Sequence, residues 1–303
     1  MSDELYQTLI EMVPKENILL DEDMSRHTTF CVGGPAKYFV IVETQEQLSK
    51  LVKYLNIVDR EFFLLGNGSN ILVSDKGYKG VILKLKGEFE RIEVSGTQIT
   101  CGAAALLGQV SRYALESSLT GMEFASGIPG SIGGAIVMNA GAYDGEMSQI
   151  TKSVTVVSPE GELMTLDADT MEFGYRTSIL KKYKYIVTSV VLELKTGDKE
   201  SIGKLMSELN MRRRDKQPLE YPSAGSTFKR PEGYYAGKLI MDAGLRGFTI
   251  GGARVSDKHC GFVINQGNAS ASDVYDVICQ VTETVKEKFG VKLEREVILL
   301  GDF

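Results

Sequence analysis

The chain has 303 residues, of which 24% are charged and 43% are hydrophobic, and its formal net charge is −6. This length favours about two domains, and the composition allows a buried core and excludes bulk disorder. The acidic balance argues against a nucleic-acid or anionic-membrane surface, and no apolar run reaches the ~18 residues that a membrane span needs. We therefore expect no nucleic-acid partner and no membrane partner.

The four cysteines and two histidines bear on metal and redox chemistry. The cysteines lie far apart in the sequence, form no CxxC pair and, with the histidines, offer no metal-ligand spacing. The acidic start MSDELYQTL lacks the basic and apolar regions of a signal peptide. We expect a cytoplasmic protein with reduced thiols and no metal.

Alternating strands and helices are predicted for the first two thirds of the chain. The patterns indicate, in chain order, a strand at 37–42, a helix at 44–58, strands at 62–65, 81–85, 91–94 and 98–101, a helix around 106–114, a hairpin over 154–166 and a long strand at 185–194. Thr44 and Gln47 predict a capping box at the start of the first helix.

A polar stretch, TGDKE, separates this region from the last third of the chain. Apolar residues at helical spacing predict a helix over about 202–216 that ends in the basic run MRRRDK, and further helices over about 233–243 and 274–285. Gly290 is the expected C′ residue of the last helix, and VKLEREVILL is expected to close the chain as a strand. The fold class is therefore α+β, with a glycine-rich module over 1–198 and a smaller domain over 199–303.

Glycine is enriched, at roughly one residue in ten against an average of about 7%, and it concentrates in two segments. The first is Gly66-Asn67-Gly68-Ser69-Asn70. A Rossmann fingerprint needs a third glycine that opens a helix, but here Ile-Leu-Val follows, so the turn joins a strand to a strand. The segment is either a tight turn that needs positive φ or a nest of backbone N–H groups that binds an anion.

The second glycine segment runs from Gly127 to Gly134 and continues to Tyr143. Either its glycines allow a short helix to pack closely, or its bare backbone approaches an extended ligand. A helix that begins near Pro129 and Gly130 would also offer N–H groups to a phosphate. Two such segments suit a ligand as long as a dinucleotide better than one does.

Three other segments carry reactive side chains, each with a plain structural alternative. Arg176 in GYRTS is by itself an ordinary surface charge. Ser226 in AGSTFKRP stands among small residues before two cations, but the absence of a GxSxG motif and the scarcity of histidine argue against a hydrolase nucleophile. Glu294 and Glu296 in LEREV share one face of a strand, which by default is a solvated edge.

Taken together and in order, seven motifs resemble the UDP-N-acetylenolpyruvoylglucosamine reductase family over nearly the whole chain: HTTFCVGGPA, LLGNGSNILVSD, GIPGSIGGAIVMNAGAY, GYRTS, AGSTFKRP, ARVSDKHCGFVIN and LEREV. The resemblance implies an FAD-binding module of the vanillyl-alcohol-oxidase type, with two α+β lobes at about 1–83 and 84–198, followed by a smaller α+β substrate-binding domain. It implies NADPH as the reductant, a UDP-sugar substrate and a cytoplasmic role in bacterial peptidoglycan precursor synthesis. We expect a monomer or weak oligomer and a non-covalent FAD; His27 is the main candidate if the flavin is tethered.

The same resemblance implies roles for three residues. Arg176 would hold the substrate carboxylate through paired hydrogen bonds. Glu296, when protonated, would donate to the developing enolate, and Ser226 would protonate the carbanion carbon with help from the neighbouring Lys229. Glu294 is the weaker candidate, because the family's functional acid directly precedes the valine.

The remaining expected site residues fall into two groups. The cofactor-binding residues are Gly66, Asn67, Gly68, Ser69, Asn70, Gly127, Pro129, Gly130, Ser131, Gly133, Gly134, Asn139 and Tyr175. The substrate-binding residues are Lys216, Lys229, Arg230 and Lys258. Arg230 stands where many relatives carry asparagine, and the chain lacks the tyrosine-bearing insertion of the longer class, so the shorter class is indicated.

Two other functions compete with the reductase. One is a flavin oxidase of the same superfamily, for which GYRTS and LEREV have no explanation. The other is a non-catalytic module whose glycine loops bind a nucleotide. Uptake of FAD separates the enzymes from the binding module, and the response to the UDP-sugar separates the two enzymes.

Overall fold

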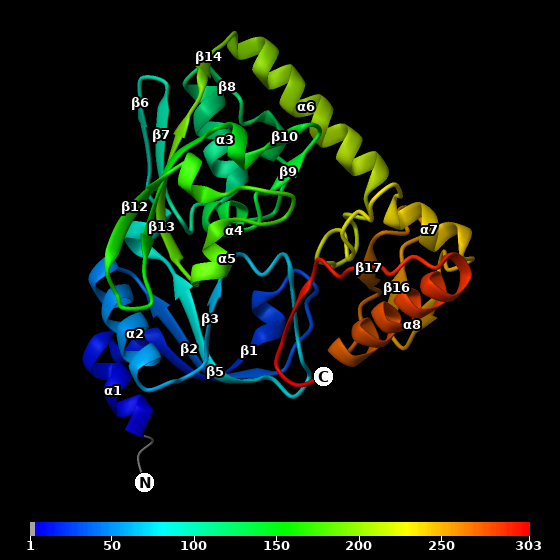
Figure 1. Ribbon diagram of the computed structural model, residues 1–303, viewed down its shortest axis with the longest axis horizontal. Coiled ribbons are helices and arrows are strands. Elements are labelled where there is room, and N and C mark those ends of the chain that lie inside the picture. The colour runs from blue at the N-terminus through cyan, green and yellow to red at the C-terminus, as the bar shows by residue number, and fades with distance from the viewer. Residues whose placement is uncertain (1–3) are drawn as a thin grey trace. The chain divides into compact units, whose positions relative to one another are not determined.

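The computed structural model describes residues 4–303, which divide into two compact units (Figure 1). Unit 1 comprises residues up to Leu19, Tyr38–Asn67 and Gly80–Arg212, and unit 2 comprises Leu20–Lys37, Gly68–Lys79 and Arg213–Phe303. The predicted functional domains, 1–198 and 199–303, remain a prediction. The compact units divide the chain differently, because two short N-terminal segments pack with the C-terminal residues.

Most strands of unit 1 belong to two sheets, and of β1 (Ile18–Asp23) only Ile18 and Leu19 lie in this unit. A four-stranded sheet has the order β1-β2-β5-β3, and an antiparallel five-stranded sheet has the order β12-β11-β13-β7-β6. The strands of the first sheet are β1 (Ile18–Asp23), β2 (Pro35–Val42), β3 (Phe62–Leu65) and β5 (Tyr78–Leu85), and those of the second are β6 (Ile92–Ser95), β7 (Gln98–Gly102), β11 (Thr151–Val157), β12 (Leu163–Asp167) and β13 (Ile186–Glu193).

Helices and short strands complete unit 1. They are α1 (Glu4–Met12), α2 (Gln45–Ile57), α3 (Leu107–Glu116), β8 (Leu119–Thr120), α4 (Ile132–Val137), β9 (Gly141–Ala142), β10 (Gly145–Glu146), α5 (Ile179–Tyr183), β14 (Lys195–Thr196) and most of α6 (Lys199–Lys216). α4 packs on β13, and α3 packs on β6 and β7. The capping box predicted for α2 is present, because the Thr44 side chain accepts from the Gln47 N–H and the Gln47 side chain accepts from the Thr44 N–H.

Unit 2 has its own apolar core around a long helix. Its elements are β4 (Ile71–Val73), α7 (Ala236–Asp242), β15 (Thr249–Ile250), β16 (Ala253–Val255), β17 (Val263–Asn265), α8 (Ala271–Phe289) and β18 (Ile298–Leu300). The apolar face of α8 packs against β15, β16 and β17, and α7 packs on the same helix. Gly290 ends α8 with a φ of 69°, as predicted for its C′ residue.

Two predicted elements differ from the structure. The helix expected from 233 begins at Ala236, because Gly233 has a φ of +74° inside a turn closed by the Tyr234 N–H and the Pro231 carbonyl. The final strand covers only Ile298–Leu300, which pairs in parallel with β4. The LEREV segment before it forms a single bridge, Phe228 to Arg295, instead of a continuous ladder.

The α+β class predicted from the sequence is confirmed. No helix within residues 4–303 has the length and apolar character to cross a membrane. The four cysteines are unpaired thiols, and burial raises the pKa of Cys101 to about 12.

Candidate active site

The first glycine segment is a turn between β3 and β4, as the sequence predicts. Gly68 has a φ of +65°, and a Cβ there would come within 1.9 Å of the His27 carbonyl oxygen, so this position requires glycine. The amide N–H groups of Gly68 and Ser69 donate to no acceptor among residues 4–303. The positive φ and the close His27 carbonyl confirm the tight turn. Two successive N–H groups in such a turn suit a phosphate, and phosphate binding stays a prediction.

The second glycine segment surrounds α4. Ser131 is its N-cap, and the N–H groups of Ile132 and Gly133 donate to the carbonyls of Ala105 and Ala103 at 2.9 and 2.8 Å. Those two amides are therefore unavailable to a phosphate, which corrects the expectation of a free helix N-terminus there. A Cβ on Gly133 would lie 3.0 Å from that of Ala103, so this glycine allows close packing.

A side-chain amide joins the two glycine segments. The Nδ2 of Asn67 donates to the carbonyl oxygen of Pro129 at 2.7 Å. Ser131 approaches from the same side, because a Cβ on Gly66 would lie 2.9 Å from its Oγ. The two segments that the sequence assigned to one extended ligand are thus in contact at Gly66–Asn67.

Lys84 is a residue of this region that sequence reasoning missed. It lies on β5 and its ammonium donates to the carbonyl of Gly66, next to the first glycine segment. Burial, with a smaller contribution from the like charge of Lys86, lowers the pKa of Lys84. The one sequence signal was a lysine inside the otherwise apolar run VILKL. Lys84 is half-buried, and a cation at this position suits an anionic group such as a phosphate.

Arg176 occupies a strained turn. Gly174 and Thr177 exchange backbone hydrogen bonds at 3.1 and 3.3 Å, and Arg176 has a φ of +57° between them. The left-handed conformation costs an L-residue roughly 1–2 kcal/mol, and non-glycine outliers of this kind cluster at functional sites. The guanidinium lies against the ring of Tyr175, at 5.2 Å from its centroid, and Nη2 is 3.5 Å from the Gly141 carbonyl oxygen.

Side chains of neighbouring residues hold this turn in place. Asn139, which is 1% exposed, donates to the Gly174 carbonyl at 3.2 Å and accepts from the Ser148 N–H at 2.9 Å. Ser178 donates to the Val137 carbonyl at 3.0 Å, and Lys181 donates to the Arg176 carbonyl at 2.7 Å. The side chain of Asn139, expected to bind the cofactor, is therefore occupied in supporting the Arg176 turn.

Ser226 begins a short extended segment of unit 2. It is exposed and follows Gly225, which has a φ of +72° with open space around it. The next residue, Thr227, is fully buried; its N–H donates to the Gly261 carbonyl at 2.8 Å, and its Oγ1 accepts from the Val263 N–H at 3.0 Å. Thr227 thus anchors the segment that presents the Ser226 hydroxyl.

The LEREV segment runs beside the Ser226 segment. The Glu296 N–H donates to the Thr227 carbonyl at 2.9 Å, and the Lys229 N–H donates to the Glu294 carbonyl at 2.8 Å. The Lys229 ammonium forms an ion pair with the Glu294 carboxylate. The Glu294 carboxylate is thus paired with a cation, and which of the two acids serves the reaction stays a prediction.

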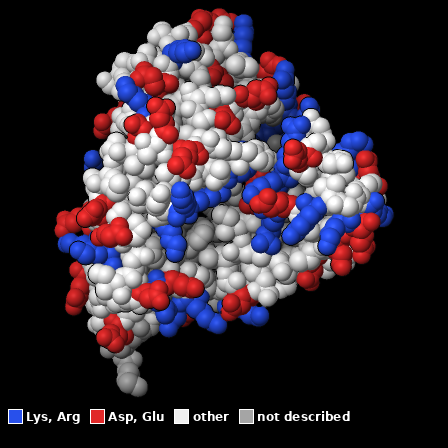
Figure 2. All heavy atoms as spheres, viewed as in Figure 1, with Lys and Arg blue, Asp and Glu red and all other residues white. Residues whose placement is uncertain are grey.

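The expected substrate-binding cations lie in different surroundings. Lys258 donates to the Arg214 carbonyl at 2.6 Å near the end of α6, and lies 3.7 Å from a Glu220 carboxylate oxygen. The Arg230 guanidinium lies over the Tyr235 ring, 4.1 Å from its centroid. Lys216 is exposed at the last residue of α6. Acidic and basic side chains are interspersed over the face drawn in Figure 2.

Both histidines have partners. The Nε2 of His27 lies 2.8 Å from the Glu22 carboxylate. The Nδ1 of His259 accepts from the Gly261 N–H at 3.1 Å, which fixes its proton on Nε2, and burial lowers the pKa of this imidazole. No cluster of three or more His, Cys, Asp or Glu side chains within residues 4–303 is arranged to hold a metal ion.

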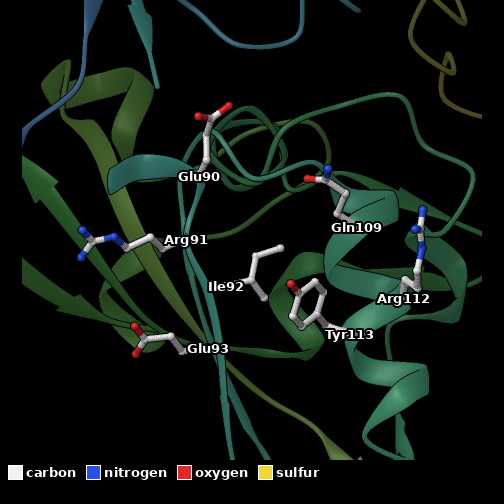
Figure 3. Close-up of a pocket in the computed structure, with 7 residues that line it drawn as sticks. All are labelled: Glu90, Arg91, Ile92, Glu93, Gln109, Arg112 and Tyr113. Atoms are coloured by element: carbon white, nitrogen blue, oxygen red, sulfur yellow. The ribbon is translucent and has the colours of Figure 1, made fainter. Parts of the chain in front are cut away.

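One surface pocket of about 590 Å³ lies in unit 1, away from all of these residues in the sequence (Figure 3). Glu90–Glu93 line one side of it, and Gln109, Arg112 and Tyr113 of α3 line the other. Its charges are mixed, and none of the expected site residues lines it.

Comparison with known proteins identifies the class of protein. A model of the FAD binding domain matches residues 36–167, and a model of the C-terminal domain of UDP-N-acetylenolpyruvoylglucosamine reductase matches residues 217–300. The fold and site together define a flavin-dependent oxidoreductase, and FAD is its cofactor.

Full-length relatives define the family. The UDP-N-acetylenolpyruvoylglucosamine reductase of Agathobacter rectalis is 48% identical over 100% of both chains, and that of Clostridium perfringens is 51% identical over 98% of both. The crystal structure of the same reductase from Thermus caldophilus is 36% identical, with a TM-score of 0.82 over 94% of this chain and 100% of that one. The chain therefore belongs to the UDP-N-acetylenolpyruvoylglucosamine reductase family.

A more distant structure shares part of the fold. Phl p 4.0202, a glucose dehydrogenase, is 12% identical and has a TM-score of 0.52 over 65% of this chain and 45% of its own. This likeness shows the fold alone. It agrees with the predicted module of the vanillyl-alcohol-oxidase type.

Proposed function

We propose that this chain reduces the enolpyruvyl ether of UDP-N-acetylglucosamine enolpyruvate to UDP-N-acetylmuramate, a precursor of peptidoglycan, with NADPH as the reductant. The observation that carries the proposal is full-length identity of 48–51% to reductases of this name. When bound, FAD would supply hydride transfer from NADPH to the enolpyruvyl methylene. The successive N–H groups of Gly68 and Ser69 would hold its diphosphate non-covalently.

Arg176 binds the carboxylate of the enolpyruvyl group. A planar guanidinium makes two parallel hydrogen bonds to a carboxylate, which a lysine ammonium cannot do. The left-handed turn and its clamps by Asn139 and Lys181 support this role, because they restrict the backbone from which the guanidinium extends.

Glu296 stabilises the negative charge that develops on the substrate, and Ser226 supplies the proton. Hydride arrival leaves carbanion character beside the carboxylate, and a protonated Glu296 donates a hydrogen bond to the enolate oxygen. The Ser226 hydroxyl then protonates the carbanion carbon as the general acid. Lys229 assists through its charge while Glu294 holds its ammonium.

The UDP diphosphate is bound by cations of unit 2. Arg230 is the strongest candidate, because the Tyr235 ring supports its guanidinium at 4.1 Å from the centroid and leaves the planar fork oriented. Lys216 and Lys258 are the further candidates. We infer that the enzyme acts in the cytoplasm as a monomer or weak oligomer, without nucleic acid.

The test uses the visible spectrum of the purified protein under anaerobic conditions. We expect a yellow protein from which acid releases the FAD. In the intact protein, NADPH should bleach the flavin absorbance. UDP-N-acetylglucosamine enolpyruvate should then restore that absorbance as UDP-N-acetylmuramate forms. A colourless protein that takes up no FAD would overturn the enzyme proposal. Recolouring by oxygen alone, with the UDP-sugar inert, would favour a flavin oxidase.

A further inference from the structure

The first glycine segment ends in Asn70, whose side chain reaches the LEREV segment. Its Nδ2 donates to the backbone carbonyl of Glu296 at 3.2 Å, and its own carbonyl accepts from the Ile298 N–H at 3.0 Å. From the next residue on, β4 and β18 pair in parallel, with Ile71 opposite Ile298. Asn70 thus holds the LEREV segment at two points just before the regular ladder begins.

The backbone of Glu296 is fixed from both sides as a result. Its N–H donates to the Thr227 carbonyl at 2.9 Å, and its C=O accepts from Asn70. Val297, the next residue, is 2% exposed and packs in the core of unit 2. With both peptide groups and the next side chain held, the Glu296 carboxyl can move only through its own side-chain torsions.

We propose that Asn70 is a positioning residue for Glu296: its side-chain amide sets the direction in which the Glu296 carboxyl leaves the backbone. This inference rests on the proposed role of Glu296 as donor to the substrate enolate. Without the amide, the Glu296 carbonyl loses this partner, and fewer restraints fix the orientation of its peptide group. A displacement of about 1 Å at a reacting group can lower the rate by about 10²-fold.

Asn67 provides a matched comparison in the same turn. It is also an asparagine that donates from Nδ2 to a backbone carbonyl, but its acceptor is Pro129 in the second glycine segment. Loss of that amide separates the two cofactor segments and does not touch LEREV. The two asparagines, three residues apart, therefore support different parts of the reaction.

The experiment measures the two half-reactions separately in the FAD-loaded enzyme. In Asn70→Ala we expect flavin reduction by NADPH within about twofold of the wild type, and reoxidation by UDP-N-acetylglucosamine enolpyruvate slowed by about 10- to 100-fold. The pH profile of reoxidation should also change, because the carboxyl has moved. Asn67→Ala should instead weaken FAD binding, measured by fluorescence titration of the apoprotein.

Asn56→Ala controls for the loss of an asparagine amide as such. Asn56 donates to the Pro159 carbonyl at 3.1 Å, where the turn between β11 and β12 meets α2. We expect this variant to leave both half-reactions at wild-type rates. Equal slowing of both half-reactions in Asn70→Ala, or an unchanged reoxidation rate and pH profile, would overturn the positioning role.

A double-mutant cycle with Glu296→Ala separates this inference from the proposed function. If Asn70 acts through Glu296, adding Asn70→Ala to Glu296→Ala slows reoxidation by less than about twofold more. Full multiplication of the two effects would reject the positioning role while leaving the role of Glu296 intact. Fast reoxidation in Glu296→Ala alone would reject the proposed role of Glu296 itself.

Discussion

The Arg176 turn, residues 174–178, and the LEREV segment, residues 293–297, hold their proposed catalytic side chains in opposite ways. Arg176 has a left-handed backbone that side chains such as Asn139 and Lys181 clamp. Glu296 has its N–H and C=O bonded to neighbouring segments without a positive φ. The Arg176 turn therefore stores backbone strain and the LEREV segment does not. Substitutions in the two regions should affect the free energy of unfolding differently.

The largest expected effect is on the proton donor beside LEREV. Ser226→Ala should slow substrate-dependent reoxidation of the flavin by about 10²- to 10⁴-fold, the usual range for loss of a general acid. Flavin reduction by NADPH should survive, because it needs no proton from Ser226. Stopped-flow absorbance measures both steps, and loss of both together would show that the role given to Ser226 is wrong.

Arg176→Gly should separate activity from stability. Reoxidation by the UDP-sugar should slow by about 10²-fold or more, because the paired hydrogen bonds to the carboxylate are lost. The free energy of unfolding should not fall, because glycine adopts positive φ without the roughly 1–2 kcal/mol cost. A less stable variant in urea unfolding would contradict the assignment of strain to this turn.

Lys184→Gly is the matched control for that change. Lys184 also has a positive φ, of 55°, but it caps α5 outside the proposed site. We expect a stability gain of about 1 kcal/mol or less, with both half-reactions unchanged. A loss of activity in this control would show that relief of strain, and not the guanidinium, explains the Arg176 variant.

Asn139→Ala should destabilise the Arg176 turn, because it removes the side chain that is hydrogen-bonded to Gly174. The Gly174 carbonyl and the Ser148 N–H both lose a partner in a buried place, which costs about 1–3 kcal/mol of unfolding free energy. Reoxidation should slow while FAD content stays at the wild-type level. If the variant loses FAD but its reoxidation by the UDP-sugar is normal, Asn139 binds the cofactor, as the sequence predicts.

A smaller effect on stability is expected at Asp75, which stabilises the start of α8. Its carboxylate accepts from the N–H groups of Ala271 and Ser272, both at 2.8 Å, at the first turn of α8. Asp75→Ala should lower the unfolding free energy by about 1 kcal/mol, as for loss of an N-terminal cap. Asp302→Ala, which removes an exposed ion pair with Lys79, should change it by less than about 0.5 kcal/mol.

The smallest expected effect is a pH dependence from His259. Burial lowers the folded-state pKa of His259 below the ordinary value of about 6.5, so well above that pH the imidazole is neutral in both states and has no effect on stability. As the pH falls below the unfolded-state pKa, the unfolded chain takes up the proton first, and stability is lost towards the folded-state pKa. His259→Asn, which keeps an acceptor for the Gly261 N–H, should flatten this part of a stability–pH curve.

Local signals predicted most of the fold. The capping box at Thr44 and the αL glycine at 290 fixed helix ends because the atoms involved lie within one turn of each other in sequence. The final strand was predicted too long because the pattern of VKLEREVILL cannot show where its partner β4 ends. Pairing depends on residues more than 200 positions away.

Sequence motifs predicted which residues belong to the candidate site, but they did not predict the hydrogen-bond partners of those residues. The sequence identified Arg176, Ser226 and Glu296 through family resemblance, and the glycine segments through composition. The cofactor role predicted for Asn70 and Asn139 stays a prediction. Their hydrogen bonds to the Glu296 and Gly174 carbonyls were not predictable, because an asparagine in a loop gives no sign of which carbonyl it will reach. Sequence reasoning missed Lys84 and Asp75, whose partners, Gly66 and the start of α8, are set by tertiary packing.

The central claim is that the Arg176 turn and the LEREV segment serve the same chemical step, and one double-mutant cycle tests it. Reoxidation by UDP-N-acetylglucosamine enolpyruvate is measured in NADPH-reduced Arg176→Lys, Glu296→Gln and the double variant. If both side chains stabilise the same carboxylate as it becomes an enolate, the double variant should be no more than about threefold slower than the slower single variant. Effects that multiply in full, or a variant that slows only the reduction by NADPH, would contradict the account.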